Sequence, residues 1–285
     1  MRSYNIAGYT IIFLHILAAG FTAPSDWGFL AGTIIGLLYL LFIWFVGGIY
    51  ASNILHMGIA HRSMEFKAWF VKSITVFFSV AGIYINPTTW VNRHRHHHAF
   101  SDHEGDPNKL ADDGFWKTLY LCFFPYKCKR DLARDEILKT PTMRFVSTPY
   151  FAVFSQISSY GILLLLFGEW IFALSLWLGV RVFALWVNMI QNYWTHDKRF
   201  GTRRYDDSHD NAMNITDWLP VTATFSASLQ NNHHHSPRLL RTSHDDSEYD
   251  FGFTTVRAMK ALGLVEATSS GMKMPKDIPL EEAGF

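Results

Sequence analysis

The chain has 285 residues, of which 49% are hydrophobic and only 17% are charged, and its formal net charge is +1. In an ordinary soluble domain about 25% of residues are charged. The near-neutral balance excludes nucleic-acid binding by bulk electrostatics, and the apolar content excludes intrinsic disorder. The two cysteines, Cys122 and Cys128, are too few for a disulfide framework or a cysteine-based zinc site.

Long uncharged segments follow one another along the chain. Residues 3–25, 27–61, 73–92 and 145–168 contain no Asp, Glu, Lys or Arg, and a further apolar stretch from residue 170 is broken only by Arg181. A helix of about 20 apolar residues spans the hydrocarbon core of a bilayer. The sequence therefore predicts an all-α integral membrane protein. We expect its four spanning helices at about residues 5–23, 29–54, 146–167 and 170–191.

The uncharged segment 73–92 receives a different assignment, because a spanning helix here would separate the histidines before it from those after it. Lys67 and Lys72 flank its start, and Asn86-Pro87 interrupts its end. We therefore expect an amphipathic helix over about residues 67–86 that lies on the membrane surface.

Basic residues give the expected orientation. The two short turns between paired spans contain Asp26 and Glu169 but no Lys or Arg, whereas the longer segments hold nearly all the basic residues. The positive-inside rule then places residues 93–144 and 197–285 in the cytoplasm. We expect residues 1–285 to form a single multi-pass domain with a histidine-rich cap facing the cytoplasm.

Most of the 14 histidines lie in four short segments near the ends of these predicted helices. The first segment is His56-Met-Gly-Ile-Ala-His61, and its two rings point about 140° apart on an ideal α-helix. Such a pair suits two metal ions, or a helix that bends at its end. In the second segment His94, His97 and His98 share one helical face.

His96 points away from that face. The third segment is Asn192-Tyr-Trp-Thr-His196 and the fourth is Gln230-Asn-Asn-His-His-His235. An isolated histidine is more often packed or solvated than a ligand, so we expect His15 to be packed and His209 and His244 to be exposed. Eight or more imidazoles exceed the four ligands of a tetrahedral zinc site, so the count predicts two metal ions.

The segments HMGIAH, HRHHH, NYWTH and QNNHH resemble the histidine boxes of the membrane fatty acid desaturases, most closely the Δ9-type acyl-CoA and acyl-lipid branch. The flanking words Gly105-Asp-Pro-Asn108 and Ser247-Glu-Tyr-Asp-Phe251 agree, and the resemblance covers about residues 50–265. It implies four membrane helices capped by a cytoplasmic region that holds two iron ions. It also implies an enzyme that uses O2 to insert a double bond into an acyl chain.

Carried over by position, the resemblance implies metal ligands at His56, His61, His94, His97, His98, His196, His233 and His234. It further implies that Asn192 reaches a metal ion through water. Gln230 departs from the pattern, since the Δ9-type branch usually has histidine there, although front-end desaturases also carry glutamine. One metal bond and the position of the double bond are therefore left open.

Nearby carboxylates are candidates to accept the second ring N–H of a ligating histidine and thereby fix its tautomer. These candidates are Asp102, Glu104, Asp106, Asp197 and Asp217. For Asp106, which precedes Pro107, a simple turn is an equal alternative. Arg181 lies inside the last predicted span, where a charge is costly, so we expect it to pair with a polar group or to reach toward the interface.

The sequence contains neither a dinucleotide-binding fingerprint nor a cysteine-rich iron–sulfur motif, so electrons must come from a separate carrier of the ferredoxin or cytochrome b5 type. The other expected partners are the bilayer and a fatty acyl group carried on coenzyme A, acyl carrier protein or a lipid. Exposed cations could dock an acidic donor or simply follow the positive-inside rule. These cations are Lys127, Lys129, Arg130, Arg203 and Arg204.

Two rival functions fit parts of the pattern. A fatty acyl or lipid hydroxylase uses the same oxidant, and a small difference in substrate placement decides the outcome. A membrane metal-binding or transport protein would instead hold its ligands within the bilayer between helices. The histidine segments lie at predicted helix ends, which favours the enzyme.

Overall fold

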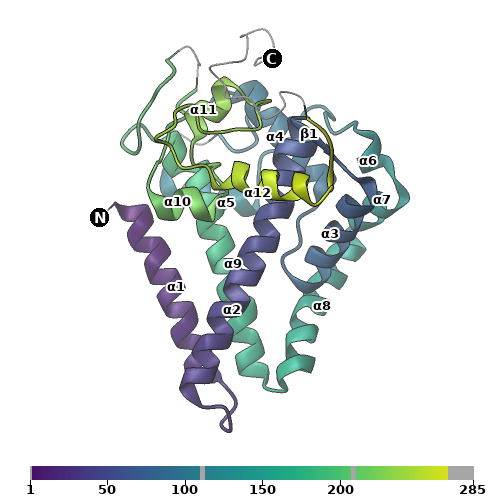
Figure 1. Cartoon of the computed structure of the whole chain (residues 1–285), viewed down its shortest axis with the longest axis vertical. Coiled ribbons are helices and arrows are strands. Elements are labelled where there is room, and N and C mark those ends of the chain that lie inside the picture. Colours follow the sequence, from purple (N-terminus) through teal and green to yellow (C-terminus); the bar gives the residue numbers. More distant parts are fainter. Residues whose placement is uncertain (1, 110–112, 207–209, 269–285) are drawn as a thin grey trace.

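The computed structural model describes residues 2–109, 113–206 and 210–268. Four long helices form a bundle: α1 (Ser3–Thr22), α2 (Gly28–Gly48), α8 (Pro149–Phe167) and α9 (Trp170–Asn192). Figure 1 shows them below a cap that contains most of the remaining elements. Each is part of a helix long and apolar enough to cross a membrane, so the expectation of four such helices is confirmed.

Close packing of the bundle depends on small residues, as is common between membrane helices. A Cβ added at Gly36 of α2 would lie only 2.5 Å from the Cβ of Ala19 on α1. The His15 ring of α1 fills the space beside Gly179 of α9, and its Nε2 lies 2.9 Å from the Gly36 carbonyl oxygen. His15 is therefore packed between three helices, as expected.

The helix α2 does not end at the bundle. It continues into a π-helix, η1 (Ile49–Ala60), that carries the chain into the cap. The strand β1 (Met64–Phe66) follows and pairs antiparallel with β2 (Val265–Thr268) near the end of the described chain. The first and last parts of the cap are thereby joined.

Two helices follow β1: α3 (Ala68–Ala81) packs beside α8 of the bundle, and α4 (Pro87–Phe100) packs against η1 in the cap. The expected helix over 67–86 is shorter because Asn86 starts the next helix, its side chain accepting a hydrogen bond from the Thr89 amide. Arg181 donates to the Gly82 carbonyl oxygen at 3.3 Å, so α3 ends beside the middle of α9. Its expected position on the membrane surface stays a prediction.

Arg181 has several polar partners at this depth. Its guanidinium donates to Gln156 Oε1 and Ser159 Oγ on α8, and it stacks 3.6 Å from the centre of the Trp177 ring. We expected the Arg181 charge to have a partner within the last span, and these neighbouring polar groups supply it.

The cap is fixed to the bundle near the start of the chain. Tyr4 is fully buried, its carbonyl oxygen accepts from Trp186 Nε1, and its hydroxyl donates to Asp217. The other cap elements are α5 (Gly114–Phe123), α6 (Glu136–Lys139), α7 (Pro141–Val146), η2 (Trp194–His196), α10 (Trp218–Ala223), α11 (Gln230–His235) and α12 (Phe251–Ala261). Through the Tyr4 contacts, the start of α1, the end of α9 and the cap are packed together.

Candidate metal centre

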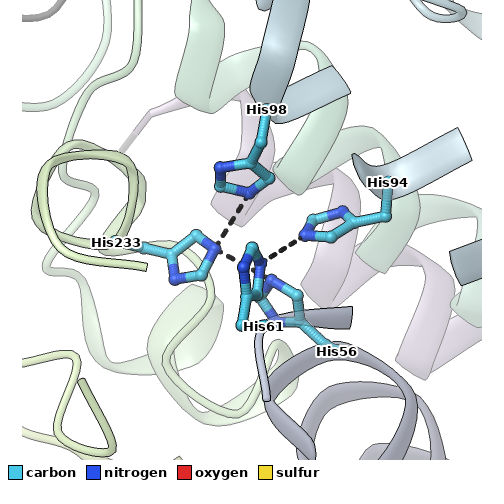
Figure 2. Close-up of side chains that lie close together, drawn as sticks. All are labelled: His56, His61, His94, His98 and His233. Carbon is cyan, nitrogen blue, oxygen red and sulfur yellow. Dashed lines mark hydrogen bonds between the residues drawn. The ribbon is translucent and has the colours of Figure 1, made fainter. Parts of the chain in front are cut away.

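Five histidine rings converge in the cap directly above α2. Figure 2 shows that they come from separate parts of the chain and point toward one another. The group consists of His56, His61, His94, His98 and His233, and one ligand nitrogen of each lies within 4.8 Å of those of the others. A metal ion could be held at their centre.

The π-helix explains how the first pair can serve one group. The His61 amide donates to the His56 carbonyl oxygen, five residues back, at 3.0 Å. This i→i+5 bonding brings residues five apart onto the same side of the helix, and the two ring centroids are 4.9 Å apart. His56 and His61 therefore belong to one group through a change of helical winding, which is neither of the two alternatives drawn from the ideal α-helix.

The helix α4 supplies the second box as expected, but its histidine face is divided between two groups. His94 and His98 belong to the five-histidine group, whereas His97 faces a second group with His196 and His234. His96 points away, with its Nδ1 2.9 Å from the Asn92 carbonyl oxygen. The His98 and His234 ring centroids are 4.4 Å apart, so the two groups adjoin.

Arg95, on the opposite side of α4, joins the first two boxes. Its guanidinium donates to the carbonyl oxygens of Ile59 and Ala60 at the end of η1, at 2.7 and 2.9 Å. It also donates two hydrogen bonds to the Asp135 carboxylate, at 2.6 and 3.1 Å. Arg95 therefore holds the end of the helix that carries His56 and His61 in register with α4.

Each histidine of the second group has a carboxylate on its Nδ1. The His97 nitrogen lies 2.9 Å from Asp106 Oδ2, that of His196 lies 2.8 Å from Asp102 Oδ2, and that of His234 lies 2.7 Å from Asp210 Oδ2. Because an ionised carboxylate only accepts, each Nδ1 carries a proton, and in the neutral imidazole the Nε2 keeps its lone pair.

Electrostatics keep these carboxylates ionised. Burial alone would raise the pKa of the Asp102 carboxyl, but the neighbouring His196 ring and the N–H donors of His196 and Asn211 hold it below its ordinary value. The pKa of Asp106 is lowered in the same way, against the effect of burial, by the His97 ring and N–H donors. Burial also lowers the pKa of His234 to about 4, although Asp210 opposes this shift.

In the five-histidine group burial again favours the neutral rings. It lowers the pKa values of His94, His98 and His233 well below their ordinary value, and the neighbouring imidazoles add to the effect. A neutral imidazole is the form that binds a metal ion.

The spacing of the ring nitrogens fits metal coordination. Facing Nε2 atoms in the first group are 2.7 Å apart for His61 and His94, 2.9 Å for His56 and His233, and 3.1 Å for His98 and His233. Two nitrogens about 2.1 Å from one metal ion and at a right angle lie about 3.0 Å apart. In the second group the buried Nε2 of His196 has no hydrogen-bond partner. Both groups therefore have the donors that a metal ion requires.

Comparison with known proteins identifies this arrangement. The model of the fatty acid desaturase family matches residues 27–244, which is most of the chain. The chain belongs to the fatty acid desaturase family. As a member it is an oxidoreductase that acts on fatty acyl chains.

Similar proteins are named for several substrates. The chain is 30% identical to the sn-1 stearoyl-lipid 9-desaturase of Anabaena variabilis, covering 88% of each protein. It is 26% identical to the Delta-9 acyl-lipid desaturase 1 of Arabidopsis thaliana, over 95% of this chain and 84% of that protein. It is 25% identical to an acyl-CoA 5-desaturase of Anemone leveillei, over 86% and 74%. Acyl carrier and double-bond position thus vary among these relatives.

Gln230 and Asn192, the two other predicted ligands of the desaturase, lie in the chain near residues of the histidine groups. The Gln230 amide nitrogen is 3.0 Å from His234 Nε2, so glutamine occupies the side of the group with fewer imidazoles. Asn192, at the end of α9, accepts from the Asn108 amide at 3.3 Å and donates to the Asn188 carbonyl oxygen. Its expected contact with a metal ion through water stays a prediction.

The carboxylate candidates divide into two sets. Asp102 and Asp106 lie where the sequence placed them, against box histidines. Asp197 instead pairs with Arg199, and Asp217 accepts from Tyr4, so within the described residues neither bonds a box histidine. Glu104 is exposed. Asp210 was missed, because it lies in a loop with no fixed spacing to a box.

His244 is a correction. We expected it to be exposed, but it is buried, with its Nδ1 2.8 Å from the Tyr205 hydroxyl. The chain after α11 folds back over the cap, which the polar sequence of that segment does not indicate. His209 lies outside the described residues.

Proposed function

We propose that this desaturase inserts a double bond at the Δ9 position of a saturated acyl chain carried on a membrane lipid, using two iron ions, O2 and electrons from a separate carrier. The observation that carries the proposal is the meeting of eight histidines in two adjoining groups. The names of the 30% identical stearoyl-lipid 9-desaturase and of the plant acyl-lipid enzyme support the lipid substrate and the position.

Eight ring nitrogens would hold the two irons, five at one and three at the other. Bound iron supplies an O2-derived oxidant strong enough to remove two hydrogens from an unactivated alkyl chain, which no amino-acid acid or base can do. The protein's own contribution is orientation. Asp102, Asp106 and Asp210 keep the Nδ1 protons in place, so that each Nε2 of the three-histidine group would be available to a metal ion.

Burial limits the access of water to part of the site, although His61, His94 and His98 are partly exposed. His97 is 3% exposed and His233 is 2% exposed. Trp90 stacks on the His94 ring at 5.0 Å and covers one side of the five-histidine group. A dry site limits loss of the oxidant to side reactions. Gln230 and a water held by Asn192 would complete the coordination of the metal that has fewer imidazoles.

We further propose that the cap faces the cytoplasm and receives its electrons there. The short turns at Asp26 and Glu169 lie at the opposite end of the bundle from the cap, and basic residues are concentrated on the cap side. The electron donor would be a soluble or membrane-anchored carrier of the ferredoxin or cytochrome b5 type.

The test is product analysis in a host that lacks Δ9 unsaturation in its lipids. Expression should yield 9-monounsaturated chains in the membrane lipids, identified by mass spectrometry of derivatised methyl esters. His97→Ala should abolish the product, whereas His96→Ala, on the same helix but directed away from both groups, should retain it.

A product that gains oxygen instead of losing two hydrogens would contradict desaturation. A double bond at another position would contradict the Δ9 assignment, and labelled acyl-CoA as the only accepted substrate would contradict the lipid carrier. Equal product from His97→Ala and the unmodified enzyme would contradict the proposed role of the histidine groups.

A further inference from the structure

The helix α5 turns its largest apolar side chains outward. Trp116, Tyr120 and Phe123 are 78%, 52% and 61% exposed, and their spacing of four and three residues puts them on one face. Phe124, directly after the helix, is 63% exposed. The opposite face is packed, with Thr118 and Leu121 buried. In water such a stripe of aromatic rings is unfavourable, so it indicates a partner.

The position of α5 beside α9 gives its depth. Cys122 Sγ lies 3.5 Å from Asn188 Oδ1, and the Phe115 ring packs against that of Tyr193 at 5.4 Å. Asn188 is about 27 Å along α9 from Trp170, at 1.5 Å per residue. The hydrocarbon core of a bilayer is about 30 Å thick. If one surface of the hydrocarbon core lies at Trp170, the other surface, on the side of the cap, lies at the level of α5.

The same contacts show that α5 is inclined. Phe115, in the first turn of α5, lies beside Tyr193, whereas Cys122 lies beside Asn188, five residues nearer the middle of α9. Phe123 and Phe124 therefore lie deepest. Figure 1 shows α5 in the lower part of the cap, next to the upper end of α9.

The charges within the segment 114–130 have one sign, although Asp113 precedes it and Asp131 follows it. Residues 114–130 contain three lysines and one arginine but no Asp or Glu. Lys117, Lys127, Lys129 and Arg130 are exposed. The Lys117 ammonium lies 5.3 Å from the centre of the Tyr120 ring and 5.5 Å from that of Tyr126, so cation and aromatic groups share one surface.

We propose that residues 114–130 form an interfacial anchor, in which the aromatic stripe of α5 enters the cap-side surface of the bilayer and the four cations pair with anionic lipid headgroups. Aromatic rings beside lysine and arginine are the composition of helices that lie in this region. The assignment removes Lys127, Lys129 and Arg130 from the candidate docking site for an acidic electron donor. It does not depend on the proposed acyl substrate.

Nitroxide accessibility in vesicles tests the anchor on the whole enzyme. Tyr120→Cys and Phe123→Cys would be labelled separately in a background carrying Cys122→Ser and Cys128→Ser. Asp246→Cys is the matched control, because its side chain is also exposed but lies in the loop after α11. In equimolar phosphatidylcholine–phosphatidylserine vesicles, the ratio of collisions with O2 to collisions with a water-soluble nickel chelate should be several-fold higher at 120 and 123 than at 246.

A separate variant tests the proposed pairing of the four cations with anionic headgroups. Replacing Lys117, Lys127, Lys129 and Arg130 with glutamine should reduce the shielding of position 120 from the nickel chelate in these vesicles, toward the value found in phosphatidylcholine alone. Labels at 120 and 123 as accessible to nickel as the label at 246 would overturn the anchor. Shielding that develops only when a ferredoxin or cytochrome b5 is added would overturn it in favour of protein docking.

Discussion

Replacing Asp210 with asparagine tests how the three-histidine group is built. The carboxylate lies 2.7 Å from His234 Nδ1 and is 8% exposed at its side chain. An ionised acceptor fixes the proton on Nδ1, whereas an asparagine amide can also present N–H and so allow the proton to move to Nε2. The lone pair that faces the metal would then no longer be secured.

The expected loss is moderate and confined to one group. Removing a partner of this kind commonly weakens metal affinity by about 10- to 100-fold, which corresponds to about 1.4 to 2.7 kcal/mol of binding free energy. The five-histidine group contributes no ring to the Asp210 contact, so its affinity should change little. Asp210→Asn should therefore show one weakened and one unchanged class of Fe2+ site.

The assay is anaerobic Fe2+ titration of the metal-free enzyme against a competing chelator. Asp197→Asn is the matched control, because Asp197 follows His196 directly but bonds Arg199 instead of a box histidine. Equal losses in both variants would mean that the effect is general rather than due to the His234 contact. Unchanged iron affinity in Asp210→Asn would refute the orienting role of the carboxylate.

Other substitutions address neighbouring features. Arg95→Met should leave the half-buried Asp135 carboxylate with only Arg62 as an ionic partner and lower the unfolding free energy by roughly 2 kcal/mol, measured in detergent as a drop in melting temperature; an unchanged temperature would contradict its bridging role. Gln230→His adds an imidazole beside His234, so iron should dissociate more slowly from the three-histidine group, and faster release would contradict that geometry. Gly48→Leu should destabilise the enzyme in the same melting assay, because even a Cβ at this position would lie 1.9 Å from the Phe225 ring.

The parts of the fold that follow local rules could be predicted from the sequence. Apolar runs of the right length identified the four long helices, and the i, i+3, i+4 spacing placed His94, His97 and His98 on one face. The π-helix could not be predicted, since an i→i+5 pattern has no composition signal of its own. The five-residue spacing of His56 and His61 therefore allowed two interpretations until the backbone was known.

The missed features depend on contacts between distant segments. Asp210 meets His234 across 24 residues of chain, and Arg95 reaches Asp135 across 40. Asp197 is closer in sequence to a box histidine than Asp210 is, yet its side chain turns toward Arg199. The contact of Arg181 with the Gly82 carbonyl oxygen, just after α3, likewise joins residues 99 apart in the chain.

We propose that eight histidines hold two iron ions in adjoining positions. Anomalous diffraction from crystals of the iron-loaded enzyme, recorded on both sides of the iron absorption edge, tests it most directly. We expect two iron peaks, one surrounded by His56, His61, His94, His98 and His233 and the other by His97, His196 and His234. A single peak, or iron bound away from these rings, would contradict it.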